Sequence, residues 1–133
     1  MSDAANEPIW GRVEAMDEHL DSRVAGVYKD QPLAQDWGRV AKVSEECGEA
    51  IDALIAWTGQ NPRKGVCGTI DDLLNELADV VMTGVLAIQH FTKDADETRR
   101  IVEAKATAIY ERMVEWEKST VRLADTREGP DRE

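Results

Sequence analysis

Two acidic motifs carry the chemistry that this sequence indicates most clearly. They read EECGE and, further along the chain, ELAD. On an α-helix, residues three apart project within about 60° of each other. Glu46 and Glu49 would therefore share one side of a helix, and Glu76 and Asp79 would share one side of another. Like charges this close repel by roughly 4 kcal/mol per pair at an effective dielectric constant near 20, so the pattern predicts a neutralising cation.

The donor atoms of these motifs favour a hard divalent cation. Mg²⁺ prefers carboxylate oxygens and often joins protein carboxylates to substrate phosphates, and Mn²⁺ accepts similar ligands. Ferritin-like di-iron sites have histidine three residues after a glutamate, but here Glu49 and Asp79 hold those positions. The histidines, His19 and His90, lie elsewhere in the sequence. A plain solvated face stays open as the alternative for either motif alone.

The elements that must position these carboxylates are helices. Apolar residues recur every three or four positions without sustained alternation, which predicts an all-α fold. We expect four main helices in a bundle, at about 9–28, 33–57, 70–90 and 94–118. Thr69 followed by Asp72 resembles a capping box at the start of the third helix.

The second and third expected helices each have an apolar face beside the acidic stripe. The apolar residues are Val43, Cys47, Ile51, Leu54 and Ile55 on the second helix and Leu73, Leu77, Val80, Val81 and Val85 on the third. We expect these helices to pack as an antiparallel pair through their apolar faces, which would bring the acidic stripes together along one edge. Cys47 is expected to be an inert packing residue.

Length and composition indicate one small domain. The chain has 133 residues, enough for one core, and we expect a helical domain over 1–118 followed by a polar, flexible tail over 119–133. Because so short a chain buries a limited core, we expect a homodimer or homotetramer to complete the bundle.

The charge and the termini restrict the class of partner and the location. A formal net charge of -11 argues against binding of polymeric nucleic acid. Two cysteines without metal-type spacing fit a reducing compartment. The beginning of the chain lacks the pattern of a signal peptide, and no apolar stretch approaches the roughly 18 residues of a membrane span. We therefore expect a cytoplasmic protein that does not enter a membrane.

The two motifs together resemble the EExxE and ExxD signature of the MazG-like all-α nucleoside triphosphate pyrophosphohydrolases. The resemblance covers roughly positions 34–112 and includes the order and helical setting of the motifs. It implies hydrolysis of a (deoxy)nucleoside triphosphate to the monophosphate and pyrophosphate, in the removal of unwanted nucleotides. It also implies that Mg²⁺ is held by four carboxylates: Glu46, Glu49, Glu76 and Asp79.

Other residues have roles that the resemblance and the helical pattern suggest. Glu45 is a candidate general base that acts on a metal-bound water, with a supporting or surface role as the alternative. Lys42 could meet a substrate phosphate or simply pair with Glu46. Arg63 and Lys64 could close on the substrate from the loop between the acidic helices, or remain solvated.

The fourth helix matches the family pattern incompletely. The family uses a lysine, an asparagine four residues later and an arginine three further on for phosphate and sugar contacts. This sequence has Lys105 and Arg112, but Ile109 takes the asparagine position, which leaves the sugar contact open. Two alternatives follow: a helical interaction or regulatory module that has lost turnover, and a carboxylate metal-storage bundle.

Overall fold

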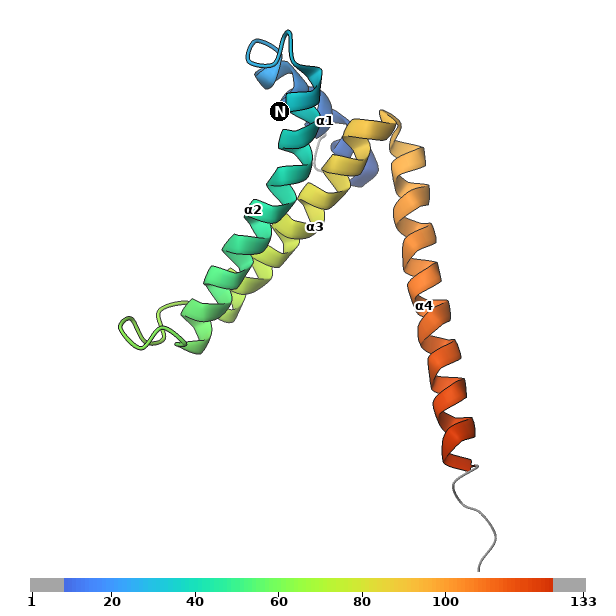
Figure 1. Cartoon of the computed structure of the whole chain (residues 1–133). Coiled ribbons are helices and arrows are strands. Elements are labelled where there is room, and N and C mark those ends of the chain that lie inside the picture. The colour runs from blue at the N-terminus through green and yellow to red at the C-terminus, as the bar shows by residue number, and fades with distance from the viewer. Residues whose placement is uncertain (1–8, 126–133) are drawn as a thin grey trace, which may run out of the picture. The chain divides into compact units, whose positions relative to one another are not determined.

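The computed structural model describes residues 9–125, and all the regular structure within that range is helical (Figure 1). The helices are α1 (Ile9–Val24), α2 (Pro32–Thr58), α3 (Ile70–Thr92) and α4 (Ala95–Asp125). Because no strand occurs among these residues, the expectation of an all-α fold with four helices is confirmed.

Local chemistry explains where the central helices begin and end. Pro32 opens α2, where its missing N–H costs no helical hydrogen bond, and Gly59 ends the helix with a left-handed φ of 66°. The predicted capping box opens α3: the Thr69 hydroxyl accepts from the Asp72 N–H at 3.1 Å, and the Asp72 carboxylate accepts from the Thr69 N–H at 2.8 Å. Lys93, also left-handed with φ 54°, ends α3.

Two helix ends differ from the sequence-based expectation. α1 ends at Val24, whose carbonyl then accepts from the N–H groups of Val27 and Tyr28 in a closing turn. α4 continues through Asp125, past the expected end at 118, so the first part of the expected tail is helical. The remainder of that tail, 126–133, lies outside the described residues.

α2 and α3 run antiparallel side by side, joined by the loop 59–69, and α1 packs against α3 (Figure 1). The residues of α2 that are buried are Glu46 and Ala50. The expected apolar face of α2 lies largely outside this contact, because Cys47 is exposed and the exposed fraction of Ile51 is 57%. The prediction that Cys47 packs in the core is therefore wrong for the described chain.

The size of the residues in the contact accounts for this choice of face. Ala50 is small, so the backbones of α2 and α3 can approach closely along its line. That line also contains Glu46 and, one turn after Ala50, the half-buried Ala53. The pair thus packs through small residues and carboxylates, and larger apolar side chains of both helices remain exposed, among them Leu54, Leu77 and Val81.

The chain divides into two compact units, and the boundary lies within α4 after Thr98. The first unit contains α1, α2, α3 and the first turn of α4. Thr98, which is fully buried, belongs to it and donates from its hydroxyl to Gln89 Oε1 at 2.8 Å. The second unit is the rest of α4, described by itself. Among the described helices, none combines the length and apolar character needed to cross a bilayer.

Candidate metal centre

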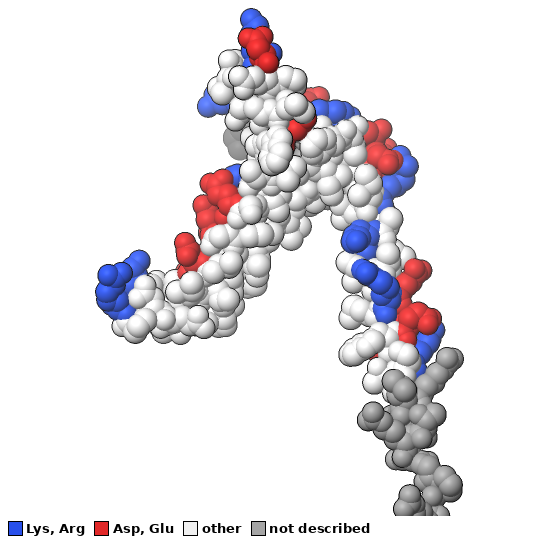
Figure 2. All heavy atoms as spheres, in the orientation of Figure 1, with Lys and Arg blue, Asp and Glu red and all other residues white. Residues whose placement is uncertain are grey.

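Three of the four predicted metal ligands meet in the structure. Glu46 and Glu49 on α2 and Glu76 on α3 each present a carboxylate oxygen, and these oxygens lie within 4.8 Å of one another. Glu46 is buried, with 7% of its surface exposed, whereas Glu76 is half-buried and Glu49 is exposed. The group therefore opens from the α2–α3 contact toward solvent, and acidic side chains gather along this helix pair (Figure 2).

Lys42 partly neutralises this acidic group. Its ammonium lies 2.7 Å from Glu46 Oε1 and 3.0 Å from Glu45 Oε2. These two hydrogen bonds raise the pKa of Lys42 well above its usual value. The alternative in which Lys42 pairs with Glu46 is thus the arrangement seen, and Glu45 shares the same ammonium.

Glu49 experiences the uncompensated charge of the group. Repulsion from the Glu46 carboxylate, assisted by burial and by the Glu76 carboxylate, raises the pKa of Glu49 above its ordinary value. A raised carboxylate pKa means that the ionised form is unfavourable in this position. An additional cation would relieve that cost, and the all-oxygen donor set suits Mg²⁺ or Mn²⁺.

Asp79 and Glu45 lie at the margin of the group. Asp79 is exposed on α3 and is not among the three carboxylates that come together. The Glu45 side chain is 58% exposed and has Lys42 as its ion-pair partner. Both roles predicted for these residues remain predictions.

The basic residues of the loop 59–69 lie at the far end of the helix pair, where blue side chains gather in Figure 2. Backbone hydrogen bonds from the N–H groups of Cys67 and Gly68 to the Ala56 carbonyl, at 2.9 and 3.2 Å, tie the loop to α2. A Cβ on Gly68 would lie 3.0 Å from the Ala56 Cβ, so this close approach favours glycine. Lys64 lines a cavity of about 210 Å³ beside this tether.

The remaining predicted substrate residues belong to other segments. Arg63 is exposed, and its backbone N–H donates to Asn61 Oδ1 at 3.1 Å. Lys105 and Arg112 are exposed on the part of α4 that forms the second unit. Ile109, between them, is 42% exposed.

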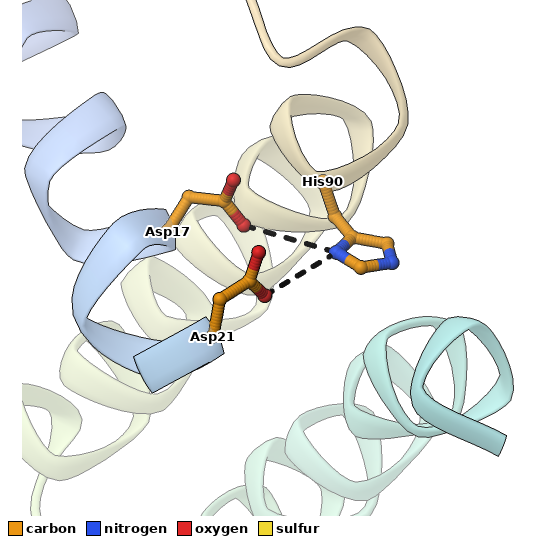
Figure 3. Close-up of side chains that lie close together, drawn as sticks. All are labelled: Asp17, Asp21 and His90. Carbon is orange, nitrogen blue, oxygen red and sulfur yellow. Dashed lines mark ion pairs between the residues drawn. The ribbon is translucent and has the colours of Figure 1, made fainter. Parts of the chain in front are cut away.

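A second cluster, which was not predicted from the sequence, forms where Asp17 and Asp21 on α1 face His90 near the end of α3 (Figure 3). His90 Nδ1 lies 3.9 Å from Asp17 Oδ1 and 3.6 Å from Asp21 Oδ1. One signal was present in the sequence: Asp17 lies one helical turn after the apolar Val13, on the same side of the helix. The structure shows both residues to be buried. Nothing local to α1 indicated that His90 would be its neighbour.

Two cations already contact these aspartates. Lys93 Nζ lies 2.8 Å from Asp17 Oδ2 and 2.6 Å from Asp21 Oδ2, and Arg39 lies 2.7 Å from Asp21 Oδ1. Burial opposes ionisation of Asp21, but hydrogen bonds from Lys93 and Arg39 outweigh it and lower the pKa of Asp21. Burial likewise opposes the charged form of Lys93, but its bonds to both aspartates raise its pKa. This network holds α1 against α2 and α3.

Comparison of the chain with protein-family models, with curated proteins and with solved structures yields no match.

Proposed function

We propose that this protein is a Mg²⁺-dependent nucleotide pyrophosphohydrolase of the MazG-like kind, which converts a (deoxy)nucleoside triphosphate to the monophosphate and pyrophosphate. One observation carries the proposal: Glu46, Glu49 and Glu76 come from two helices, yet their oxygens lie within 4.8 Å of one another. Three glutamates of the acidic motifs that resemble the family signature therefore form one group in space. Removal of unwanted nucleotides is the role that this activity would serve.

The residues of the group fit a hard divalent cation. The donors are all oxygens, and the raised pKa of Glu49 reflects excess negative charge. Glu46, Glu49 and Glu76 would hold Mg²⁺, with Asp79 as the fourth ligand. When bound, Mg²⁺ would neutralise triphosphate charge and make a coordinated water more acidic.

The other polar residues would orient substrate and move a proton. Glu45 extends from the same turn of α2 as Glu46 and could accept a proton from the attacking water, once its exposed carboxylate releases Lys42. Lys42 already lies among the carboxylates and would pair with a phosphate oxygen of the incoming triphosphate. Arg63, Lys64, Lys105 and Arg112 are the further candidates for phosphate contacts.

A second copy of the chain would complete the fold. Among the described residues, the apolar side chains that are buried are Val13 and Ala50, a small core for four helices. Ile51 and Leu54 on α2 and Val81 on α3 leave a large apolar surface exposed. Full burial of an exposed side chain of this size is worth about 1.5–3 kcal/mol. Covering the exposed half of each of these side chains would contribute a part of that, which favours a homodimer or a homotetramer.

Pyrophosphate release from a panel of common and damaged nucleoside triphosphates tests this activity. The wild-type protein should release pyrophosphate with Mg²⁺ and lose the activity in EDTA. Glu46→Gln and Glu76→Gln should each reduce the rate on the order of 100-fold or more, because each removes a charged metal ligand. Glu18→Gln, an exposed carboxylate change on α1, serves as the matched control and should leave the rate unchanged.

Retention of activity in both acidic-group variants would refute the proposal.

Ile109 favours one alternative, a binding module without turnover, because it takes the position of the family's asparagine. Calorimetry combined with the pyrophosphate assay separates the two functions. A module without turnover would bind Mg²⁺ and nucleotide in the calorimeter but release no pyrophosphate from any substrate of the panel.

A further inference from the structure

The cluster of Asp17, Asp21 and His90 has the donor set of a transition-metal site. Asp17 and Asp21 lie one helical turn apart on α1, so both carboxylates project toward the end of α3, where His90 points back at them (Figure 3). The distances of 3.9 and 3.6 Å from His90 Nδ1 to the two carboxylates exceed a hydrogen bond. They are close to the roughly 3.4 Å that separates two ligand atoms bound at about 2.1 Å to a tetrahedral ion.

The far side of the imidazole is arranged as in known metal centres. His90 Nε2 lies 2.8 Å from Asp36 Oδ1. A carboxylate can only accept, so the neutral form of the ring has its proton on Nε2, and in that form the lone pair of Nδ1 faces Asp17 and Asp21. A carboxylate that orients a ligating histidine in this way is the usual outer partner of a protein-bound metal.

An orphaned buried atom gives a second, independent indication of a ligand. The Asp17 side chain is 4% exposed, yet its Oδ1 has no hydrogen-bond partner. Arg39 approaches this oxygen only to 3.6 Å. A buried carboxylate oxygen without a donor is costly, and Asp17 Oδ1 is the atom that faces His90 Nδ1.

Lys93 holds the place that a metal ion would need. Its ammonium contacts the other oxygen of each aspartate and lies 3.4 Å from His90 Nδ1. The Lys93 side chain is 50% exposed at the end of α3, so it can turn out into solvent without breaking the helix. The ammonium and a divalent ion would therefore compete for the same carboxylates.

We propose that Asp17, Asp21 and His90 bind a first-row divalent transition-metal ion such as Zn²⁺, with Asp36 orienting His90 and with Lys93 and Arg39 acting as the competing cations. The imidazole nitrogen and two carboxylates suit Zn²⁺ better than Mg²⁺, which prefers oxygen ligands. This site differs in composition and in helices from the acidic group of Glu46, Glu49 and Glu76.

Nitrogen-15 NMR of the two imidazoles during a Zn²⁺ titration tests the proposal in the full chain. The sequence has two histidines, so the exposed His19 is an internal reference and His19→Gln assigns the signals. Cys47→Ser with Cys67→Ser should form the background, because both exposed thiols would otherwise take up Zn²⁺. Saturable binding should shift His90 Nδ1 and leave His19 unchanged, and Mg²⁺ should shift neither.

Variants distinguish a metal site from a purely structural ion network. Lys93→Met removes the cation that contacts both aspartates and should tighten Zn²⁺ binding about tenfold, whereas Asp17→Asn should weaken it about tenfold or more. Glu76→Gln, in the other acidic group, should leave the His90 response unchanged. Circular dichroism checks that each variant is folded.

Two results would overturn the proposal. The first is a wild-type titration in which His90 does not respond to Zn²⁺, or responds no more than His19. This experiment does not depend on the folding of any variant. The second is a folded Lys93→Met variant with unchanged or weaker Zn²⁺ binding, since loss of the ammonium frees both aspartates for the ion if the ion binds there.

Discussion

Single carboxylates in this protein differ in whether their charge is compensated. Glu46 is buried but has the Lys42 ammonium at 2.7 Å. Glu49 is more exposed, yet Glu46 and Glu76 raise its pKa because their charges act on it together. The acidic group therefore contains an unfavourable repulsion between carboxylates. Its effect on the free energy of unfolding should depend on pH.

Glu49→Gln should stabilise the metal-free protein at neutral pH. Because the pKa of Glu49 is higher in the folded state than its ordinary value of 4.5, the folded state retains the proton more readily. Glu49 therefore favours unfolding increasingly as pH rises from about 4.5 through its folded-state pKa. Urea unfolding in EDTA should show the variant to be more stable at pH 7, with the difference vanishing below pH 4.5.

Mg²⁺ supplies the control for this effect. If Glu49 is a ligand, Mg²⁺ should stabilise the wild-type protein more than Glu49→Gln. Glu18→Gln, an exposed change on α1, should not alter the stabilisation by Mg²⁺. A Glu49→Gln variant that is less stable than wild type in EDTA at pH 7 would contradict the charge argument.

At the scale of elements, helix ends are set by short-range chemistry. The α3 capping box satisfies free N–H groups at the helix start, and its hydrogen bonds lower the pKa of Asp72. The start of α3 in turn fixes where Glu76 appears relative to Glu46. The acidic group can therefore form only if α3 begins at the correct residue.

Thr69→Ala should reduce the free energy of unfolding by about 1 kcal/mol, because the helix loses its hydroxyl cap. Thermal and urea unfolding measure this change. Thr107→Ala is the matched control: Thr107 lies inside α4, and its hydroxyl donates to the Glu103 carbonyl within the helix. Since alanine favours a helix interior, this control should not be destabilising. Equal losses in both variants would show that the cap contributes nothing specific.

At the scale of the whole molecule, the described chain leaves apolar surface uncovered. The exposed fractions of Ile51, Leu77 and Val81 are 57%, 45% and 63%. Exposed apolar surface of this kind marks association sites, since single chains seldom leave it in contact with water.

Sedimentation of the wild-type protein should therefore give a mass of two or four times the 14.8 kDa of one chain. Ile51→Asp places a charge on the apolar surface and should shift the protein toward the monomer. Val27→Asp changes a residue that is 76% exposed in the turn after α1 and should leave the mass unchanged. A wild-type monomer at working concentrations would contradict the proposed self-association.

The sequence by itself determined the features that depend on neighbours along the chain. The all-helical fold, the approximate helix positions and the α3 capping box were predicted and are confirmed. The shared phase of Glu46 and Glu49 follows from helical geometry alone. These features could be predicted because backbone hydrogen bonds and helix periodicity act over three or four residues.

Only the tertiary structure decided which helix faces meet. Periodicity favoured Ile51 and Cys47 for the contact with α3, but Ala50 permits closer approach and places Glu46 inside it. Only the fold joined Asp17 to His90, which are far apart in the sequence. The physical reason is the same in both cases: the register between packed helices depends on the fit of side chains from two segments, and neither segment alone contains that information.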